Sequence, residues 1–252
     1  MDVLGIDIGG SGIKGGVVDV ARGVLVTERL RLDTPQPATP DAMLATVVEL
    51  VKTLGWSGPI GCGFPAVIER GVAKTAANID AGWIGIDVGE RVRVATGCPC
   101  SVINDADAAG IAEMRFGEGV GRNEAVLVLT LGTGIGSALF HRSRLFPNLE
   151  LGFLPLKGRP AERYTSAAVR KQDKLSWKAW SRRLDLFLLH VERLLSPELI
   201  IVGGGVSRKS EKFFPFLDTR AELVPARLLN RAGIVGAACF AAGELKALHP
   251  AV

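Results

Sequence analysis

The sequence predicts an α/β protein built from two similar lobes with a cleft between them. Apolar, strand-like runs alternate with amphipathic, helix-like stretches, which is the pattern of sheets flanked by helices. This alternation occurs twice, since residues 125–140 repeat the strand–glycine–strand arrangement of residues 3–18. Aligning Asp7 with Thr130 matches the two glycine loops, which indicates an internal duplication. Ligands of such sheets bind at the carboxyl ends of strands.

The composition is that of an ordinary globular protein. Its 252 residues are 48% apolar and 22% charged, enough for one large domain or two modest ones. No apolar run reaches the roughly 18 residues of a membrane-spanning helix. Met1 leads directly into a strand-like run without a secretory leader pattern. We therefore expect a cytoplasmic protein with no membrane partner.

Cysteine and histidine offer neither a disulfide framework nor a metal site, because no Cys-x-x-Cys or His-Glu-x-x-His spacing occurs. Charge is more informative. The net charge is only +4, but residues 157–183 hold nine Lys or Arg against Glu162 and Asp173. This basic segment favours contact with a polyanion, and a solvated basic face is the alternative on charge alone.

In the first half, residues 3–18 predict a hairpin whose glycines permit the turn. A helix is expected after the cap Thr39, with Pro40 in its first turn and Gly55 as its stop. Its apolar face is read as Leu44, Val47, Val48, Val51 and Leu54. A strand is expected at 60–64 and another ending at residue 103, with a loop-rich stretch at 66–90 between them.

In the second half, strands are expected at 125–130 and 137–140 on either side of a glycine loop. An amphipathic helix covers 184–195 and a buried strand covers 198–202. Gly203, Gly204 and Gly205 form a tight turn, and Ser207 is the expected cap of the helix that follows. The last helix is expected near 232–245.

Asn104 and Asp105 stand where the strand ending at Ile103 gives way to a helix. Asp105 suits general-base catalysis, because a carboxylate beside anion-binding loops can take the proton of an attacking hydroxyl. The alternative is that Asp105 simply caps the helix. Asn104 has both a donor and an acceptor, which suits a sugar hydroxyl.

Two glycine loops can hold phosphates, although no Walker pattern occurs and each alone could be a simple hairpin turn. In both, glycines free backbone N–H groups for an anion, and a hydroxyl or a lysine adds to the site. The first loop offers Gly9, Gly10, Ser11, Gly12 and Lys14; the second offers Gly132, Thr133, Gly134 and Gly136. Asp7 suits the orientation of hydrated Mg²⁺, and a turn-forming aspartate is its alternative.

These motifs resemble the ROK family of bacterial sugar kinases. The resemblance lies in DIGGSGIK (7–14), NDADAA (104–109), LGTGIGSAL (131–139) and ELG (150–152). Four more stretches are similar to its polyphosphate glucokinase branch: AANIDAGWIG (76–85), LSWKAW (175–180), LLSPELIIVGGGVS (194–207) and NRAGIVG (230–236). Together they span nearly the whole chain.

The resemblance implies a two-lobed actin-like ATPase (ribonuclease H-like) fold. Residues 1–106 then form a small N-terminal lobe, completed by the C-terminal helix at about 238–252, and residues 107–237 form a large lobe. It implies transfer of a phosphoryl group from inorganic polyphosphate, and from ATP as a second donor, to the 6-hydroxyl of glucose. Mg²⁺ is the implied cofactor, and a homodimer is the expected assembly.

The same resemblance assigns roles to residues. Asp105 is the general base. The sugar is held by Asn78, Asn104, Asp105 and Glu150, with Gly63 and Pro65 beside them. Phosphates are held by Asp7, Gly9, Gly10, Ser11, Lys14, Gly132, Thr133, Gly134 and Gly136. The nucleoside of ATP is held by Gly203, Gly204 and Gly205, and the basic segment lies along a polyphosphate chain.

One departure bears on activity. The family pattern has a sugar-contacting histidine where Phe153 stands, and an unpaired sugar hydroxyl costs roughly 1–3 kcal/mol. Weak glucose binding, a different hexose and lost activity are all open. The rival functions are an ATP-dependent kinase for another hexose and a degenerate sugar-binding protein. A DNA-binding repressor is disfavoured, because the sequence starts on its first strand without a helix-turn-helix, so no nucleic acid partner is expected.

Overall fold

The computed structural model describes residues 1–248, which divide into two compact units. The first unit comprises Met1–Ala112 and the C-terminal segment from Arg231, and the second comprises Glu113–Asn230. Of the expected C-terminal helix at 238–252, residues 249–252 lie outside the described residues.

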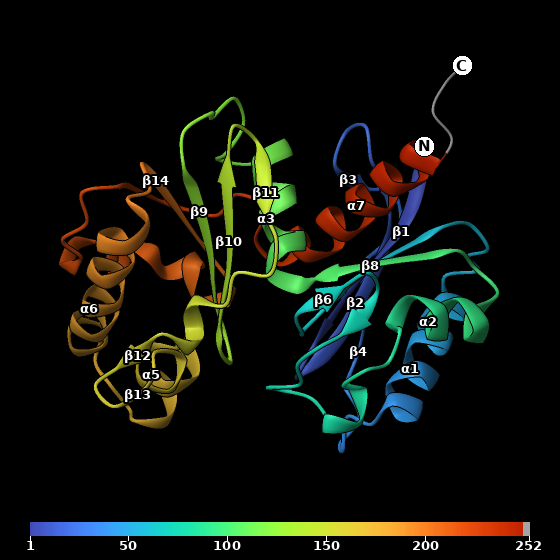
Figure 1. Cartoon of the computed structure of the whole chain (residues 1–252), viewed down its shortest axis with the longest axis horizontal. Coiled ribbons are helices and arrows are strands. Elements are labelled where there is room, and N and C mark those ends of the chain that lie inside the picture. Colours follow the sequence, from blue (N-terminus) through green and yellow to red (C-terminus); the bar gives the residue numbers. More distant parts are fainter. Residues whose placement is uncertain (249–252) are drawn as a thin grey trace. The chain divides into compact units, whose positions relative to one another are not determined.

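The first unit is built on a mixed sheet of order β3-β2-β1-β5-β8, with β4 also paired to β2 (Figure 1). Strands β1 and β2 are antiparallel, whereas β1, β5 and β8 run parallel. The strands are β1 (Asp2–Gly9), β2 (Gly12–Asp19), β3 (Val24–Leu25), β4 (Leu30–Leu32), β5 (Ile60–Phe64) and β8 (Cys100–Asn104). A separate small hairpin is formed by β6 (Ile68–Glu69) and β7 (Val72–Ala73).

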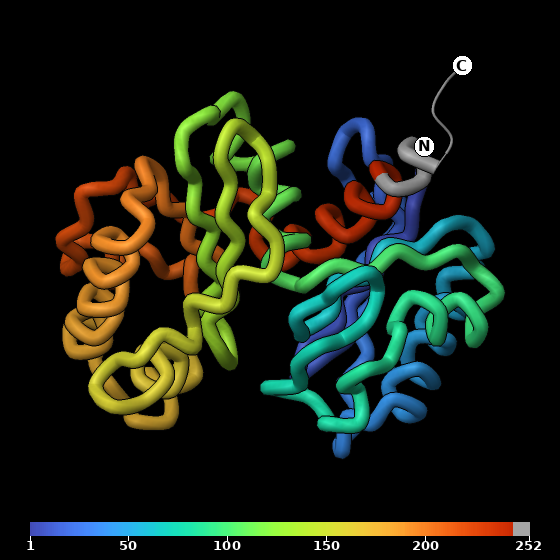
Figure 2. Tube along the Cα trace, in the orientation of Figure 1, coloured from blue at the N-terminus to red at the C-terminus, as the bar shows by residue number. Residues whose placement is uncertain are grey.

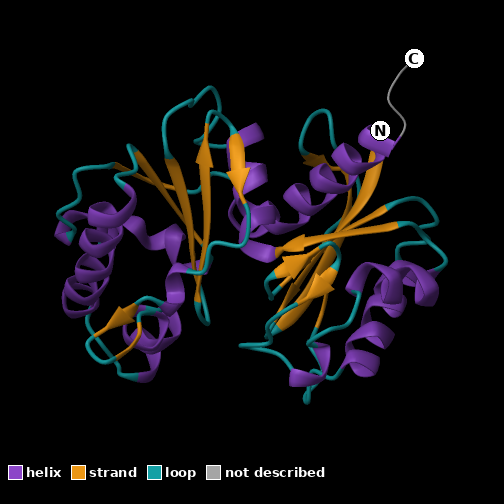
Figure 3. Ribbon diagram, in the orientation of Figure 1, coloured by secondary structure: helices purple, strands orange, loops and turns teal. Residues whose placement is uncertain are grey.

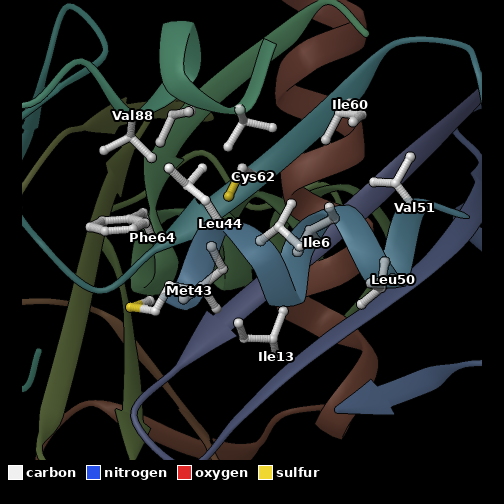
Figure 4. Close-up of a cluster of buried hydrophobic side chains, with 14 of the residues drawn as sticks. Ile6, Ile13, Met43, Leu44, Leu50, Val51, Ile60, Cys62, Phe64 and Val88 are labelled. Carbon is white, nitrogen blue, oxygen red and sulfur yellow. The ribbon is translucent and has the colours of Figure 1, made fainter. Parts of the chain in front are cut away.

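One face of this sheet packs on α1 (Pro40–Thr53) and α2 (Val88–Thr96). Figure 4 shows Ile6 of β1 and Cys62 and Phe64 of β5 gathered against Met43 and Leu44 of α1. Burying a large apolar side chain stabilises a fold by about 1.5–3 kcal/mol. A short 3₁₀ helix, η1 (Ala81–Trp83), closes this core through Trp83.

The other face packs on α7 (Ala232–Leu248), so this late helix lies beside the first strand, β1 (Figure 2). Two glycines make this contact close. A Cβ at Gly5 would lie 2.0 Å from the carbonyl oxygen of Ile234, and one at Gly61 would lie 1.9 Å from that of Ala237. Only glycine therefore fits under α7 at these two positions.

The second unit repeats this plan, with its own sheet and helices (Figure 3). The order of the strands in this sheet is β11-β10-β9-β14-β15. Again an antiparallel hairpin, β9–β10, is extended by parallel strands. The strands are β9 (Val126–Leu131), β10 (Ile135–His141), β11 (Arg144–Phe146), β14 (Leu199–Gly203) and β15 (Glu222–Pro225), with a small hairpin of β12 (Pro155–Leu156) and β13 (Arg159–Pro160). The shared strand order confirms the predicted duplication.

Helix α6 (Trp177–Leu195) covers one face of this second sheet. Its buried residues Leu184, Leu188 and Val191 pack with alternate residues of β9 and β14. The remaining helices are α3 (Asp105–Phe116), α4 (Glu162–Thr165), α5 (Ala167–Gln172), η2 (Leu151–Phe153), η3 (Gly205–Lys212), η4 (Phe214–Phe216) and η5 (Leu229–Arg231).

The stretch 66–90 is loop-rich, as predicted, with the short β6, β7 and η1 and the start of α2 within it. Two local predictions were wrong. The buried face of α1 includes Met43 and Leu50, whereas Val48 is only half-buried. Ser207 does not cap the helix after β14, since η3 begins at Gly205 and the Ser207 hydroxyl instead donates back to the Gly204 carbonyl at 2.8 Å.

Candidate active site

The carboxyl ends of β1, β5 and β8 bring several predicted site residues together in the first unit. The strand register places Asp7 beside Gly63, and Gly63 beside Ile103. Asn104 and Asp105 follow immediately. A Cβ at Gly63 would lie at the ordinary contact distance of 3.5 Å from the Asp105 Cα, so the start of α3 lies beside β5.

Asn104, not Asp105, caps helix α3. The Asn104 Oδ1 accepts hydrogen bonds from the backbone N–H groups of Ala106 at 2.9 Å and Asp107 at 3.1 Å, which is the contact a helix cap makes. Its Nδ2 donates to the Ala66 carbonyl at 3.0 Å and so holds the turn that contains Pro65. This contact uses one of the two Nδ2 hydrogens.

Asp105 is therefore the first residue of α3, and the alternative that it is simply the cap is wrong. Its Oδ1 accepts the backbone N–H of Ala106 at 2.8 Å, and the side chain is half-buried. The carboxylate thus lies at a positive helix end, on the rim of the sheet where ligands of α/β proteins bind.

The first glycine loop joins β1 to β2, with Gly9 paired to Gly12 and Gly10 and Ser11 at its tip. A Cβ at Gly10 would lie 3.6 Å from the Asn78 carbonyl oxygen, so the exposed Asn78 stands against this loop. The first loop and a predicted sugar-binding residue are therefore neighbours.

Asp7 lies beneath this loop and pairs with Lys14, whose Nζ is 2.9 Å from Asp7 Oδ2. The first turn of α7 reaches the same carboxylate, since a Cβ at Gly233 would lie 2.8 Å from the Asp7 Cγ. The pair brings one negative and one positive side chain to the base of the loop.

The second glycine loop joins β9 to β10 in the second unit. The Gly132 N–H donates to the Gly134 carbonyl at 3.0 Å, and the Gly132 carbonyl accepts from the Ala168 N–H of α5 at 3.0 Å. Thr133 is exposed, and a Cβ at Gly132 would meet nothing within 4 Å. The turn is held at its base and open at its tip, while Gly136 follows in β10.

A glycine turn after β14 lies against the second loop. Gly203 pairs with Thr130 of β9, and Gly204 has a φ of +82°. A Cβ at Gly204 would lie 2.3 Å from the Leu131 carbonyl oxygen, whereas one at Gly205 would meet nothing within 4 Å. The predicted phosphate and nucleoside residues of this unit are thus adjacent.

Glu150 is fixed beside the second loop by Ser137 of β10. The Ser137 hydroxyl donates to the Leu149 carbonyl and accepts the Leu151 N–H at 3.0 Å. Burial, and then the negative charge of Glu162, raise the pKa of Glu150 above its usual value. Phe153, at the end of η2, is 46% exposed.

Glu162 is a site residue that the sequence reasoning missed. Its Oε2 accepts the Ile135 N–H, at the exit of the second loop, at 3.3 Å, and its charge acts on Glu150. In the sequence it stands 27 positions from Ile135 and among basic residues. No local pattern in the sequence therefore identified Glu162 as a residue of the site.

The basic segment, residues 157–183, contains β13, α4, α5 and the start of α6. Two of its arginines are engaged: Arg183 pairs with Asp173 at 2.8 Å, and the Arg170 guanidinium lies 3.9 Å from the centre of the Trp177 ring. The other seven cations are exposed, namely Lys157, Arg159, Arg163, Lys171, Lys174, Lys178 and Arg182.

Over residues 1–248, no three or more His, Cys, Asp and Glu side chains are grouped to hold a metal ion. Within the same range, no helix is long and apolar enough to cross a bilayer. Cys62, Cys98 and Cys100 are free thiols.

The predicted residues thus fall into two sets. In the first unit lie Asp7, Gly9, Gly10, Ser11, Lys14, Gly63, Pro65, Asn78, Asn104 and Asp105. In the second unit lie Gly132, Thr133, Gly134, Gly136, Glu150, Gly203, Gly204 and Gly205.

Two units with the same strand order, each with a glycine turn in its first hairpin, define the two-lobed actin-like ATPase fold. Solved structures bear this out. The inorganic polyphosphate/ATP-glucomannokinase of Arthrobacter sp. strain KM superposes with a TM-score of 0.94 at 48% identity, covering 96% of this chain and 99% of that one. A ROK family glucokinase from Streptomyces griseus, in complex with glucose and AMPPNP, shares the fold with a TM-score of 0.83 at 23% identity, covering 96% of this chain and 100% of that one.

Sequence comparison narrows the class to a family. The polyphosphate glucokinase of Mycobacterium tuberculosis (strain H37Rv) is 46% identical over 236 residues, covering 93% of this chain and 89% of that protein. That of Mycobacterium leprae is 43% identical over 243 residues, covering 96% of this chain and 75% of that protein. Residues 3–147 match the ROK family. This chain belongs to the ROK family.

Proposed function

We propose that this protein is a sugar kinase that transfers the terminal phosphoryl group of inorganic polyphosphate, and of ATP as a second donor, to the 6-hydroxyl of glucose. The proposal rests on one observation in the first unit, where the ends of β1, β5 and β8 are neighbours. The glycine loop with its Asp7–Lys14 ion pair follows β1, and Asn104 and Asp105 lie at the end of β8. The relatives named polyphosphate glucokinase, at 43–46% identity, support the choice of sugar and donor.

In this reaction the oxygen of the sugar 6-hydroxyl attacks the terminal phosphorus, and Asp105 takes the proton of that hydroxyl. The new O–P bond replaces the bond to the next phosphate, which leaves as a shortened polyphosphate or as ADP. Asn78, Asn104 and Glu150 hold sugar hydroxyls, with Gly63 and Pro65 beside them. The half-buried position of Asp105 supports its role as the base.

The donor phosphates contact the backbone N–H groups and side chains of the two glycine loops, with Lys14 as a point charge. Mg²⁺ commonly keeps several waters and binds through one or two carboxylates plus substrate phosphates. Asp7 fits such a site as the orienting carboxylate. When bound, the ion offsets charge on the transferred group.

The basic segment is the proposed contact surface for a polyphosphate chain. Seven exposed cations on a short stretch of the second unit match a polyanion better than they match a single nucleotide. Gly203, Gly204 and Gly205 would hold the nucleoside of ATP. The homodimer and the cytoplasmic location expected from the sequence remain predictions.

Purified protein, Mg²⁺, polyphosphate or ATP, and a panel of hexoses test the proposal. Glucose with polyphosphate should yield glucose 6-phosphate, identified by phosphorus NMR, and chelation of Mg²⁺ should abolish turnover. Mannose belongs in the panel, because the Arthrobacter relative is a glucomannokinase. If no hexose is phosphorylated from either donor, the proposed function fails.

The exposed Phe153 beside Glu150 favours one second candidate, a kinase for a different hexose. A phenyl ring offers no hydrogen bond to a hydroxyl, so a sugar lacking a hydroxyl at that point, or presenting an apolar group there, loses less than glucose. In the same panel, a kcat/KM for another hexose that exceeds the value for glucose would establish this candidate.

A further inference from the structure

Three side chains from one short segment hold three successive carbonyl groups of the first glycine loop. The Thr34 hydroxyl donates to the Gly9 carbonyl, the Gln36 Nε2 to the Gly10 carbonyl at 3.5 Å, and the Arg31 Nη2 to the Ser11 carbonyl at 2.9 Å. The segment 31–36, which we call the loop support, follows β2 and β3 in the chain and begins in β4.

These contacts fix the direction of the loop's N–H groups. In a planar trans peptide the carbonyl oxygen and the following N–H point in opposite directions. Because Thr34 and Gln36 hold the carbonyls of Gly9 and Gly10, the N–H groups of Gly10 and Ser11 point away from the loop support. Successive N–H groups turned to one side form the concave site that binds anions.

The strength of the three contacts differs. Thr34 is only 7% exposed, so its hydroxyl bond is shielded from water and is the main anchor. The Gln36 contact is long and exposed. Arg31 packs directly on the backbone, since a Cβ at Gly12 would lie 2.9 Å from the Arg31 Nε, and it also pairs with Asp33 at 2.8 Å.

We propose that the loop support is a positioning element for the phosphoryl donor: Thr34, with help from Arg31 and Gln36, preorganises the N–H groups of the first glycine loop for donor phosphate. The inference rests on the proposed function in that the anion is taken to be the donor. N–H groups that already point at the phosphate spare the energy of reorienting the loop during the reaction. Losing this order should therefore weaken the kinetics for the phosphoryl donor and not the binding of the sugar.

The test compares Thr34→Val with Thr34→Ser. Valine keeps the shape and removes the hydroxyl, whereas serine keeps the hydroxyl. One such hydrogen bond is worth about a 3- to 10-fold change in an equilibrium, so Thr34→Val should lower kcat/KM for polyphosphate and for ATP by about that factor, with KM for glucose unchanged. Thr34→Ser, which keeps the hydroxyl, should retain most of the wild-type kcat/KM for both donors.

Thr27→Val is the matched control. The Thr27 hydroxyl accepts the Val17 N–H of β2 at 3.0 Å in the same unit, so its hydrogen bond is to a strand and not to a carbonyl of the loop. Both valine variants should lower the melting temperature modestly, but only Thr34→Val should change donor kinetics. Equal donor kinetics in the two variants would overturn the inference and leave the proposed function standing.

Arg31→Met is the second variant, should Thr34→Val fold poorly, because Arg31 is exposed. Its donor kinetics are measured at low and high salt. A loss that persists at high salt supports positioning of the loop, whereas a loss that vanishes is a screened charge effect and counts against it.

Calorimetric binding of inorganic tripolyphosphate separates the two proposals. If the wild-type protein phosphorylates no hexose but binds tripolyphosphate, and Thr34→Val weakens that binding, the inference stands without the proposed function. If the wild-type protein binds no tripolyphosphate, the inference is overturned.

Discussion

Asp105 carries the proton transfer of the proposed reaction, and its place at the start of α3 makes it replaceable without disturbing the core. Asp105→Asn should lower kcat by about 10²- to 10⁴-fold, the usual worth of a general base. Asp41→Asn is the control, since Asp41 is also an acid in the first turn of a helix. Turnover within a factor of about ten of wild type would remove Asp105 from the role of base.

We expect Phe153 to weaken the contact with glucose. Phe153→His should lower KM for glucose, because an imidazole can donate or accept a hydrogen bond at this exposed position beside Glu150. Phe146→His, at another exposed phenylalanine of the same unit, should leave KM unchanged. An unchanged or higher KM for Phe153→His counts against a sugar contact at position 153.

Glu150 gives the activity a dependence on pH. Its pKa is raised by burial and by Glu162, so on acidification Glu150 binds its proton at a higher pH than an exposed glutamate does. If ionised Glu150 holds the sugar, kcat/KM for glucose falls on the acidic side. Glu162→Gln removes the negative neighbour, lowers the pKa of Glu150, and should move this acidic limb to lower pH.

Glu162→Gln also keeps an oxygen that can accept the Ile135 N–H, so the second glycine loop should stay in place. Glu69→Gln, in the other unit, is the control for a general loss of charge. A pH profile of Glu162→Gln identical to that of wild type would show that Glu150 does not titrate in the sugar step.

The sequence predicts the site residues that a local pattern identifies, but not those that only the fold brings to the site. Asn104 and Asp105 were recognisable because a polar pair after an apolar strand is a local signal. Thr34 and Glu162 were not, because their partners Gly9 and Ile135 lie 25 and 27 positions away. The sequence left open the alternative that Asp105 simply caps α3, because asparagine and aspartate both favour caps, and the structure shows that Asn104 is the cap.

At the scale of elements, the hairpins, α1, α6 and the buried strands were predictable because their periodicity is strong. Helix α2 was not, since it buries only Val88, Gly89 and Val92. Its signals lay at its ends instead: Asp87 accepts the Glu90 N–H at 2.9 Å, and Gly97 ends the helix with a φ of 73°.

The turn after β14 gives a prediction about stability. Gly204→Ala should lower the free energy of unfolding by at least roughly 1–3 kcal/mol, the cost of holding a non-glycine residue in this conformation. The clash with Leu131 adds to this cost. Gly205→Ala, where a Cβ meets nothing within 4 Å, should be nearly neutral. Urea unfolding of the two variants measures the difference, and equal midpoints would contradict it.

At the scale of the whole molecule, the internal repeat made the two-unit plan predictable. The lobe limits implied by the family resemblance, 1–106 and 107–237, stay predictions. The compact units of the structure change over between Ala112 and Glu113 and between Asn230 and Arg231. Contacts such as that of Gly5 with Ile234 determine where α7 belongs, and no sequence window contains both residues.

Charge distribution gives the last prediction, on the choice of donor. The basic segment holds nine cations against two acids, a surplus larger than the net charge of +4 of the whole chain. A polyphosphate chain along this segment would interact with several cations, whereas ATP, placed at the glycine turns, would not. Reversing Lys171 and Lys174 to glutamate should therefore raise KM for polyphosphate severalfold and leave KM for ATP nearly unchanged.

The salt dependence of KM for polyphosphate should also differ between the wild-type protein and the double variant, since contacts between exposed charges weaken as ionic strength rises. KM for polyphosphate should increase with salt in the wild-type protein and increase less in the double variant. A second double reversal, Arg29→Glu with Lys52→Glu at two exposed positions of the first unit, makes the same change in net charge and is the control. If this control raises KM for polyphosphate as much as the reversal of Lys171 and Lys174 does, long-range attraction explains the effect and the basic segment is only a solvated face.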